Sequence, residues 1–275
     1  MILNKNKLLA VLVNYGDEQL NYLVEVVSGL KRFKYFEVTI IVQSNIPLDI
    51  EGIDTVNVIT LEDYQLLPLT CRKVIWNNRN NYDVFLYGEN DHLFLEKHVE
   101  KHLEYEKILP ENRITGLIQF EENENGRYYP GYHHHFDWKY NSVETYKGLK
   151  FAHFFNTHQA SFILSRAQLF KINKSFDFNS LVEDAPLSFM DKVLNKLKKT
   201  IKKPLKYPNN YSVKCKVNTD VYDYGGMKKL ICISEFEDNL IHHLPNIYID
   251  GLRGRNKFRS REDRMNNALK KLLKK

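Results

Sequence analysis

The feature that most constrains the fold is an unbroken apolar run, LLAVLV, over Leu8–Val13. A strand that faces water on one side alternates apolar and polar residues, whereas a strand of a parallel sheet is covered on both faces and is apolar throughout. Apolar residues at helical spacing follow over residues 20–30. Because strand followed by helix is the repeating unit of such sheets, we expect an α/β fold with a mostly parallel sheet flanked by helices.

The same pattern recurs along the chain. Further strands are predicted at Val38–Val42, Val56–Ile59, Val84–Tyr87, Ile114–Phe120, Ala160–Leu164 and Leu230–Ile233, and helices at Glu96–Ile108, Ala167–Ile172 and Glu183–Leu197. The length of 275 residues suits one large domain or two small ones, and we expect a single one. Apolar runs of about 18 residues and a signal-peptide segment are both missing from the sequence. We therefore expect a soluble, cytoplasmic protein, either free or peripheral at a membrane.

Positive charge is concentrated near the C-terminus. Gly251–Lys275 holds ten Lys and Arg against two Asp and Glu, a balance of +8, so a total of +6 leaves about −2 for residues 1–250. A basic tail of this kind suits an anionic surface such as a membrane leaflet, nucleic acid or a phosphorylated lipid carrier. A solvated helix without a partner fits the charge equally well. No specific nucleic-acid-binding motif accompanies it.

Polar residues follow the predicted strands at the edge where parallel sheets bind ligands. Asn14 and Tyr15 follow the first strand, Gln43 follows the second, and Glu89 and Asp91 follow the fourth. Two carboxylates two residues apart can bind one hard cation, and oxygen ligands favour Mg²⁺ or Mn²⁺, which also bind diphosphates. An ordinary acidic turn would have the same spacing. The position of Glu89 and Asp91 at the ligand-binding edge favours the metal site over an ordinary turn.

The segment Tyr82–Phe94, YDVFLYGENDHLF, resembles the DxD-type motif of GT-A glycosyltransferases, in which an apolar strand leads into an acidic cluster such as EDD. Here the middle acid is replaced by Asn90. The resemblance implies that Asp91 binds a metal ion, that Glu89 contacts the metal or the nucleotide sugar, and that Asn90 belongs to the donor site.

Two earlier segments resemble the same family. VLVNYGDEQL is similar to the family's first strand and its loop, which implies that Val13, Asn14 and Tyr15 line the nucleotide. Gln43 is assigned to the same site because it follows the second predicted strand at the ligand-binding edge. A basic residue in the helix before the motif strand often faces the donor in these enzymes, and Arg72 has that place.

Two later segments continue the resemblance. Glu183-Asp184 is similar to the late acidic pair at a helix start that supplies the acceptor-activating base, with Asp184 as the first choice and Glu183 as the alternate. His242-His243 falls where many members have a metal-binding histidine.

The resemblance spans residues 8–250 and implies a metal-dependent glycosyltransferase. Residues 1–110 would be the nucleotide-sugar-binding half and residues 111–250 the acceptor-binding half, with 251–275 outside the domain as a basic tail. The implied reaction moves a sugar from a UDP- or GDP-linked donor to a glycan or another hydroxyl acceptor, with Mn²⁺ or Mg²⁺ as cofactor. Such a reaction needs cations to neutralise the departing diphosphate and a carboxylate to take the acceptor's proton.

Two other functions stay open. One is a non-catalytic protein that docks to nucleic acid or an anionic membrane through its tail, and the other is a metal-dependent hydrolase built on histidines. His98 and His102 share a helix face but lack the HExxH pattern of zinc proteases, so we expect them to be solvated. The His133–His135 run offers metal-ligand side chains, but successive residues do not easily converge on one ion. The aromatic residues of Tyr128–Tyr140 suit an acceptor-binding loop or a packed structural loop equally well. Neither GxxxxGK[ST] nor GxGxxG occurs, which disfavours P-loop enzymes and ordinary dehydrogenases.

Overall fold

The computed structural model describes residues 5–130, 138–183, 211–249 and 259–275, together with residues 190, 193, 194 and 196. The strand order of its central sheet is β11-β4-β1-β2-β3. These strands are β1 (Asn6–Asn14), β2 (Phe36–Ser44), β3 (Thr55–Val58), β4 (Val84–Glu89) and β11 (Ser161–Ser165). β1 pairs in parallel with β2 and β4, β2 pairs in parallel with β3, and β11 is antiparallel to β4.

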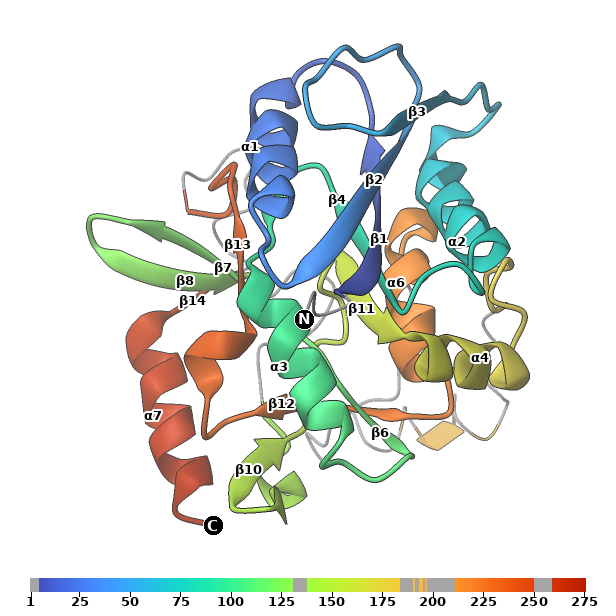
Figure 1. Ribbon diagram of the computed structural model, residues 1–275. Helices are drawn as coiled ribbons and strands as arrows, with labels where there is room; N and C mark the ends of the chain where they lie inside the picture. Colours follow the sequence, from blue (N-terminus) through green and yellow to red (C-terminus); the bar gives the residue numbers. More distant parts are fainter. Residues whose placement is uncertain are drawn as a thin grey trace.

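Both faces of β1 are covered by helices, which confirms the prediction made from its apolar run (Figure 1). Alternate residues point to opposite faces of a strand. Leu8, Ala10 and Leu12 pack against α1 (Leu20–Lys31), whereas Leu9, Val11 and Val13 share a core with α2 (Leu67–Asn77), α4 (Arg166–Ser175) and α6 (Val213–Asp223). The predicted α/β architecture, a mostly parallel sheet flanked by helices, is therefore confirmed.

Two smaller sheets adjoin the central one. The first has the order β6-β12-β10-β9, with β6 (Arg113–Thr115), β12 (Lys228–Cys232), β10 (Leu149–Ala152) and β9 (Glu144–Tyr146). The second has the order β14-β8-β7-β13-β5, with β14 (Arg259–Arg261), β8 (Gly126–Pro130), β7 (Ile118–Asn123), β13 (Leu240–His243) and β5 (His92–Leu93). The remaining helices are α3 (Glu96–Glu106), α7 (Glu262–Leu273) and the short η1 (Tyr64–Leu66), η2 (Tyr140–Ser142) and η3 (Phe236–Asn239). No helix in the described ranges is long and apolar enough to cross a bilayer.

The single strand predicted at Ile114–Phe120 is wrong, because the chain changes sheets there. β6 pairs with β12, and β7 pairs with β13. The break lies at Gly116, where a Cβ atom would stand 2.1 Å from Cε of Lys229 and 2.6 Å from Oε1 of Gln159, so a larger residue would displace these two buried side chains. The helix predicted at 183–197 falls largely outside the described residues.

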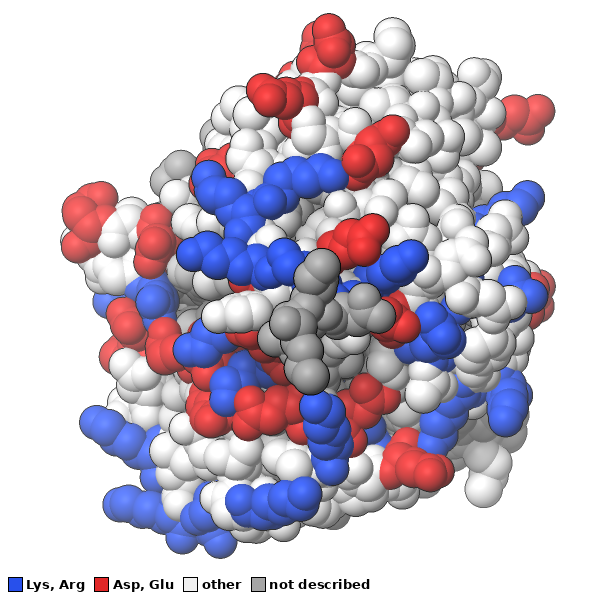
Figure 2. Space-filling view, viewed as in Figure 1, with Lys and Arg blue, Asp and Glu red and all other residues white. Residues whose placement is uncertain are grey.

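The prediction of a basic tail outside the domain is wrong for residues 259–275. α7 is amphipathic, and Met265, Ala268, Leu269 and Leu272 are buried in a core shared with β7, β8 and β12. Its other face carries exposed lysines near the C-terminus, and Figure 2 shows Lys and Arg side chains gathered at the lower left, where α7 lies in Figure 1. The prediction failed because it considered only the net charge of the segment. The apolar residues at positions i, i+3, i+4 and i+7 pack this helix against the rest of the protein.

Candidate metal centre

The acidic turn after β4 is brought against β13 by the two-residue strand β5. The antiparallel register of β5 and β13 pairs His92 with His243, and the backbone N–H of Leu244 donates to the carbonyl of Asp91 at 2.9 Å. Gly88 permits this turn, since a Cβ atom there would lie 2.5 Å from the ring of Phe94, which packs back against β4. Strand pairing therefore places Asp91, His92 and His243 together from segments about 150 residues apart.

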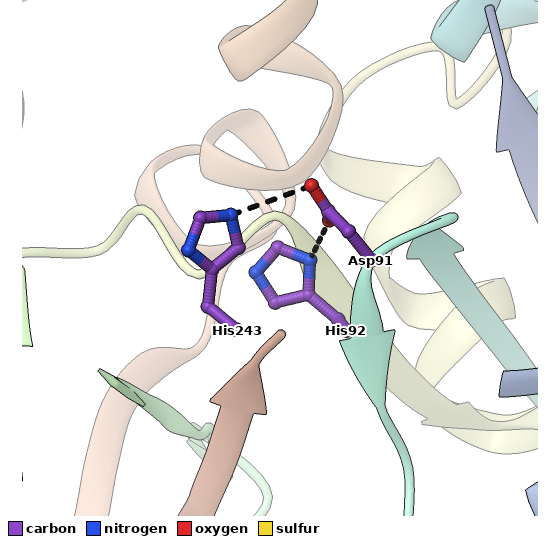
Figure 3. A group of neighbouring side chains, drawn as sticks. All are labelled: Asp91, His92 and His243. Atoms are coloured by element: carbon purple, nitrogen blue, oxygen red, sulfur yellow. Dashed lines mark ion pairs between the residues drawn. The ribbon is translucent and has the colours of Figure 1, made fainter. Parts of the chain in front are cut away.

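The three side chains converge on one point (Figure 3). One potential ligand atom from each lies within 4.8 Å of the others, and all three residues are buried. Asp91 Oδ1 lies 2.7 Å from His92 Nδ1, and Asp91 Oδ2 lies 3.3 Å from His243 Nε2. Two donors that bind one cation at right angles, each at about 2.1 Å, lie about 3 Å apart. The spacing of these atoms, which is also that of His–Asp ion pairs, is therefore compatible with ligands around a metal ion.

Two of these atoms lack hydrogen-bond partners. Asp91 Oδ1 and His92 Nδ1 are buried without a correctly aligned hydrogen bond, although they lie 2.7 Å apart. Buried polar atoms without partners are rare in proteins and commonly mark an ion, a water molecule or a functional site. The donor set, one carboxylate and two imidazoles, is a combination that divalent transition metals prefer. The residues present therefore fit a metal ion.

The electrostatics of the cluster follow from burial and proximity. Burial alone would raise the pKa of Asp91, but the neighbouring His243 and His92 hold it well below its ordinary value. Burial opposes the charged form of His243, yet its contacts with Asp91 and Glu121 raise its pKa to about 10. In the absence of a cation, the proton on His243 thus supplies the positive charge between two carboxylates. A metal ion would take over that role by displacing the proton from Nε2.

Of the other two predicted metal ligands, His242 points away from the cluster, and Glu89 interacts with Asp91 without being one of the converging ligands. His242 lies on the opposite face of β13 from His243, and its ring stacks on Phe120 with centroids 4.8 Å apart. Glu89 is half-buried, and burial together with the charge of Asp91 raises its pKa. The three converging ligand atoms thus come from Asp91, His92 and His243, without Glu89 or His242.

The predicted nucleotide-binding residues lie at the carboxyl ends of the parallel strands. Asn14 and Asn90 are buried and joined by a 2.7 Å hydrogen bond, donated by Asn90 Nδ2, which ties β1 to the turn after β4. Gln43 donates to the carbonyl of Thr70, and its Oε1 is buried without a partner.

The residues beside this pair differ in exposure. Val13 is buried, with 7% of its surface exposed, whereas Tyr15 is 62% exposed and lies against Tyr64, with ring centroids 5.4 Å apart. Buried amides and an exposed tyrosine, Tyr15, are therefore gathered on the predicted ligand-binding edge.

Arg72 is fully buried and makes internal contacts. Its guanidinium donates to the carbonyls of Phe178 at 2.5 Å and Ser180 at 2.9 Å, and it lies 4.0 Å from Asp220. Asp220 in turn accepts from the backbone N–H of Val182. Burial lowers the pKa of Arg72 to about 10, and Asp220 limits the shift. Arg72 thus holds the segment that leads to Glu183, while its role toward a donor stays a prediction.

Of the two predicted bases, Glu183 is exposed. Asp184 lies outside the described residues. The segment before them is fixed, because Arg72 and Asp220 bind its backbone.

The remaining histidine and aromatic motifs are structural wherever they are described. His98 and His102 are buried rather than solvated, and burial lowers the pKa of each to about 4. His98 accepts from the backbone N–H of Leu95, and His102 bonds to Gln168 and Thr115. Residues Tyr128, Tyr129 and Trp138 of the aromatic segment are buried. Residues 131–137, including the three consecutive histidines, lie outside the described part.

Sequence reasoning missed His92 and Glu121. His92 follows Asp91 directly, yet neighbouring residues of a strand usually point apart, so nothing local marked it as a ligand. Glu121 is 0% exposed and lies 2.6 Å from Nδ1 of His243. Both depend on pairing with β13, which lies far away in the sequence. Comparison of the sequence with models of protein families gives no match, and comparison with curated proteins gives no matching relative.

Proposed function

We propose that this protein is a metal-dependent glycosyltransferase that moves a sugar from a nucleoside diphosphate donor to a hydroxyl acceptor. The observation that carries the proposal is the convergence of Asp91, His92 and His243 at the carboxyl end of β4. That edge of a parallel sheet is where α/β folds bind nucleotides. The Asn14–Asn90 pair and the unpaired oxygen of Gln43 stand on the same edge.

The donor set narrows the choice of cation. Mg²⁺ prefers oxygen ligands and keeps much of its water, whereas Mn²⁺ and Zn²⁺ readily accept imidazole nitrogen. Because two of the three ligands are histidines, the proposal favours Mn²⁺ over Mg²⁺. A site with three protein ligands also leaves coordination positions open, which a diphosphate oxygen needs.

The surrounding residues suit a nucleotide. Tyr15, which is 62% exposed and lies against the half-buried Tyr64, offers aromatic surface on which a base can stack. Gln43 Oε1 offers a buried acceptor for a donor group of the ligand. These contacts do not distinguish a uracil from a guanine, so the donor class is a UDP- or GDP-sugar.

The proposed chemistry assigns roles to groups on either side of the bond that breaks. When bound, the cation would neutralise the charge that builds up on the departing diphosphate. Asp91, His92 and His243 would hold it. Glu183 or Asp184 would take the proton of the acceptor hydroxyl, on a segment whose backbone Arg72 and Asp220 hold in place.

Thermal-shift and turnover measurements test this proposal. Binding raises apparent stability by mass action, so we expect one nucleotide sugar to raise the melting temperature only together with Mn²⁺. Asp91→Ala should abolish that shift and lower turnover at least about 100-fold, because several kcal/mol of charge stabilisation is lost and each 1.36 kcal/mol is tenfold in rate. Asp49→Ala is the matched control, since Asp49 is exposed and far along the chain from the centre. Equal turnover in the two variants would refute the metal assignment.

A metal-dependent hydrolase is the second candidate, and the second imidazole favours it. One carboxylate and two histidines, with an open position for water, form a common catalytic zinc site. This candidate predicts that the purified protein holds zinc and cleaves its substrate without any nucleotide. Metal analysis and nucleotide dependence therefore separate the two functions.

A further inference from the structure

Glu121 is the most thoroughly buried acid next to the proposed centre. It lies on β7, its surface is 0% exposed, and it makes three contacts. Its Oε2 accepts from the backbone N–H groups of Tyr248 at 3.0 Å and Ile249 at 2.9 Å. Its Oε1 lies 2.6 Å from Nδ1 of His243. An isolated buried carboxylate is costly, so these contacts are what makes the position tolerable.

The two oxygens of Glu121 have different partners, and this fixes its orientation. The two backbone donors hold Oε2, so Oε1 faces His243, where it can accept a hydrogen bond from the Nδ1–H group. Parallel pairing of β7 with β13, which pairs His242 with Phe120, brings the next residues of the two strands together. The other nitrogen, Nε2, is then directed at Asp91, 3.3 Å away.

We propose that Glu121 is a positioning residue for the metal centre: it keeps the proton on Nδ1 of His243 and leaves Nε2 to bind the cation. The inference rests on the proposed metal centre. Histidine ligands commonly donate their second N–H to a carboxylate, which fixes the ring and the tautomer and makes the nitrogen a better ligand.

The variant Glu121→Gln tests this role with little change in volume. The amide oxygen can still accept from the two backbone N–H groups, and the NH₂ group then faces Nδ1 of His243. Because NH₂ is a donor, Nδ1 must become the acceptor, and the ring proton moves to Nε2, where it blocks the cation. We expect Mn²⁺ affinity, measured by isothermal titration calorimetry, to fall about 10- to 100-fold. The exposed Glu51 supplies the control Glu51→Gln, which should bind Mn²⁺ as the unmodified protein does.

A spectroscopic measurement separates positioning from simple anchoring of the 248–249 backbone. Nitrogen-15 spectra of the unmodified protein loaded with diamagnetic Zn²⁺ should show His243 protonated at Nδ1. Unchanged Mn²⁺ affinity in a folded Glu121→Gln protein overturns the inference while leaving the metal centre standing. A proton on Nε2 in the Zn²⁺-loaded protein overturns it too, and also removes Nε2 of His243 from the ligand set. If the unmodified protein binds neither Mn²⁺ nor Zn²⁺, the metal centre itself fails, and this inference fails with it.

Discussion

Replacing Leu272 with alanine tests whether α7 is an integral part of the protein rather than a solvated tail. Leu272 is 0% exposed, and it packs in a core that includes Trp138, Phe154 and Ile231. Removing a buried leucine side chain costs about 2–5 kcal/mol, the lost transfer energy plus the cavity that remains. For a protein of this size, 1 kcal/mol corresponds to about 2–4 °C in melting temperature. We expect a loss of about 3 kcal/mol and about 6–12 °C.

The adjacent residue supplies the control for that measurement. Leu273 follows in the same helix but is 41% exposed, so Leu273→Ala changes helix propensity and composition equally while removing little buried surface. It should change the free energy of unfolding by no more than about 0.5 kcal/mol. Urea unfolding followed by far-ultraviolet circular dichroism measures both variants. If Leu272→Ala is as stable as Leu273→Ala, the helix does not pack as described and the basic segment behaves as a tail.

Two further predictions concern buried cations. The Lys229 side chain is 2% exposed, and burial lowers the pKa of its amine from 10.5 to about 7. Between those two values the unfolded chain binds one more proton than the folded protein, so this group makes stability rise with pH by up to about 1.4 kcal/mol per unit. Lys229→Met should remove that slope in urea unfolding series between about pH 7 and 10, and parallel pH profiles for the two proteins would contradict it. Arg72→Lys keeps the charge, but a lysine amine cannot reach both carbonyls that the guanidinium binds. We expect a loss of about 2–3 kcal/mol from the unpaired buried groups, together with faster limited proteolysis near residues 178–183, and unchanged cleavage would show that Arg72 does not hold this segment.

The central sheet could be predicted from the sequence because its signal is local. The apolar runs of β1 and β4 are buried on both faces in the structure, and that of β2 is buried on one face and half-buried on the other. Such runs are recognisable without knowing their neighbours. Polar residues at their carboxyl ends, including Asn14 and Asp91, were placed on the ligand-binding edge for the same reason. The strand predicted at Ile114–Phe120 failed because a change of sheet at Gly116 leaves the apolar pattern unbroken.

Several side chains were misjudged because their surroundings come from distant segments. His98 and His102 read as solvated helix residues, yet they are buried where α3 meets β6, β11 and η3. The basic C-terminal segment read as a tail, although its apolar stripe was present in the sequence. In both cases, composition described the residues correctly but did not reveal which face another element covers.

The sequence by itself determined the parallel α/β sheet and the acidic turn at its ligand-binding edge, since apolar periodicity and strand ends are encoded within a few residues. Only the tertiary structure decided which histidine stands beside Asp91. The register of β5 against β13 places His243 there and turns His242 away, and the pairing of β13 with β7 brings Glu121 behind the ring. Alternate residues of a strand face opposite ways, so a shift of one residue in register, which the sequence does not display, would exchange the two histidines.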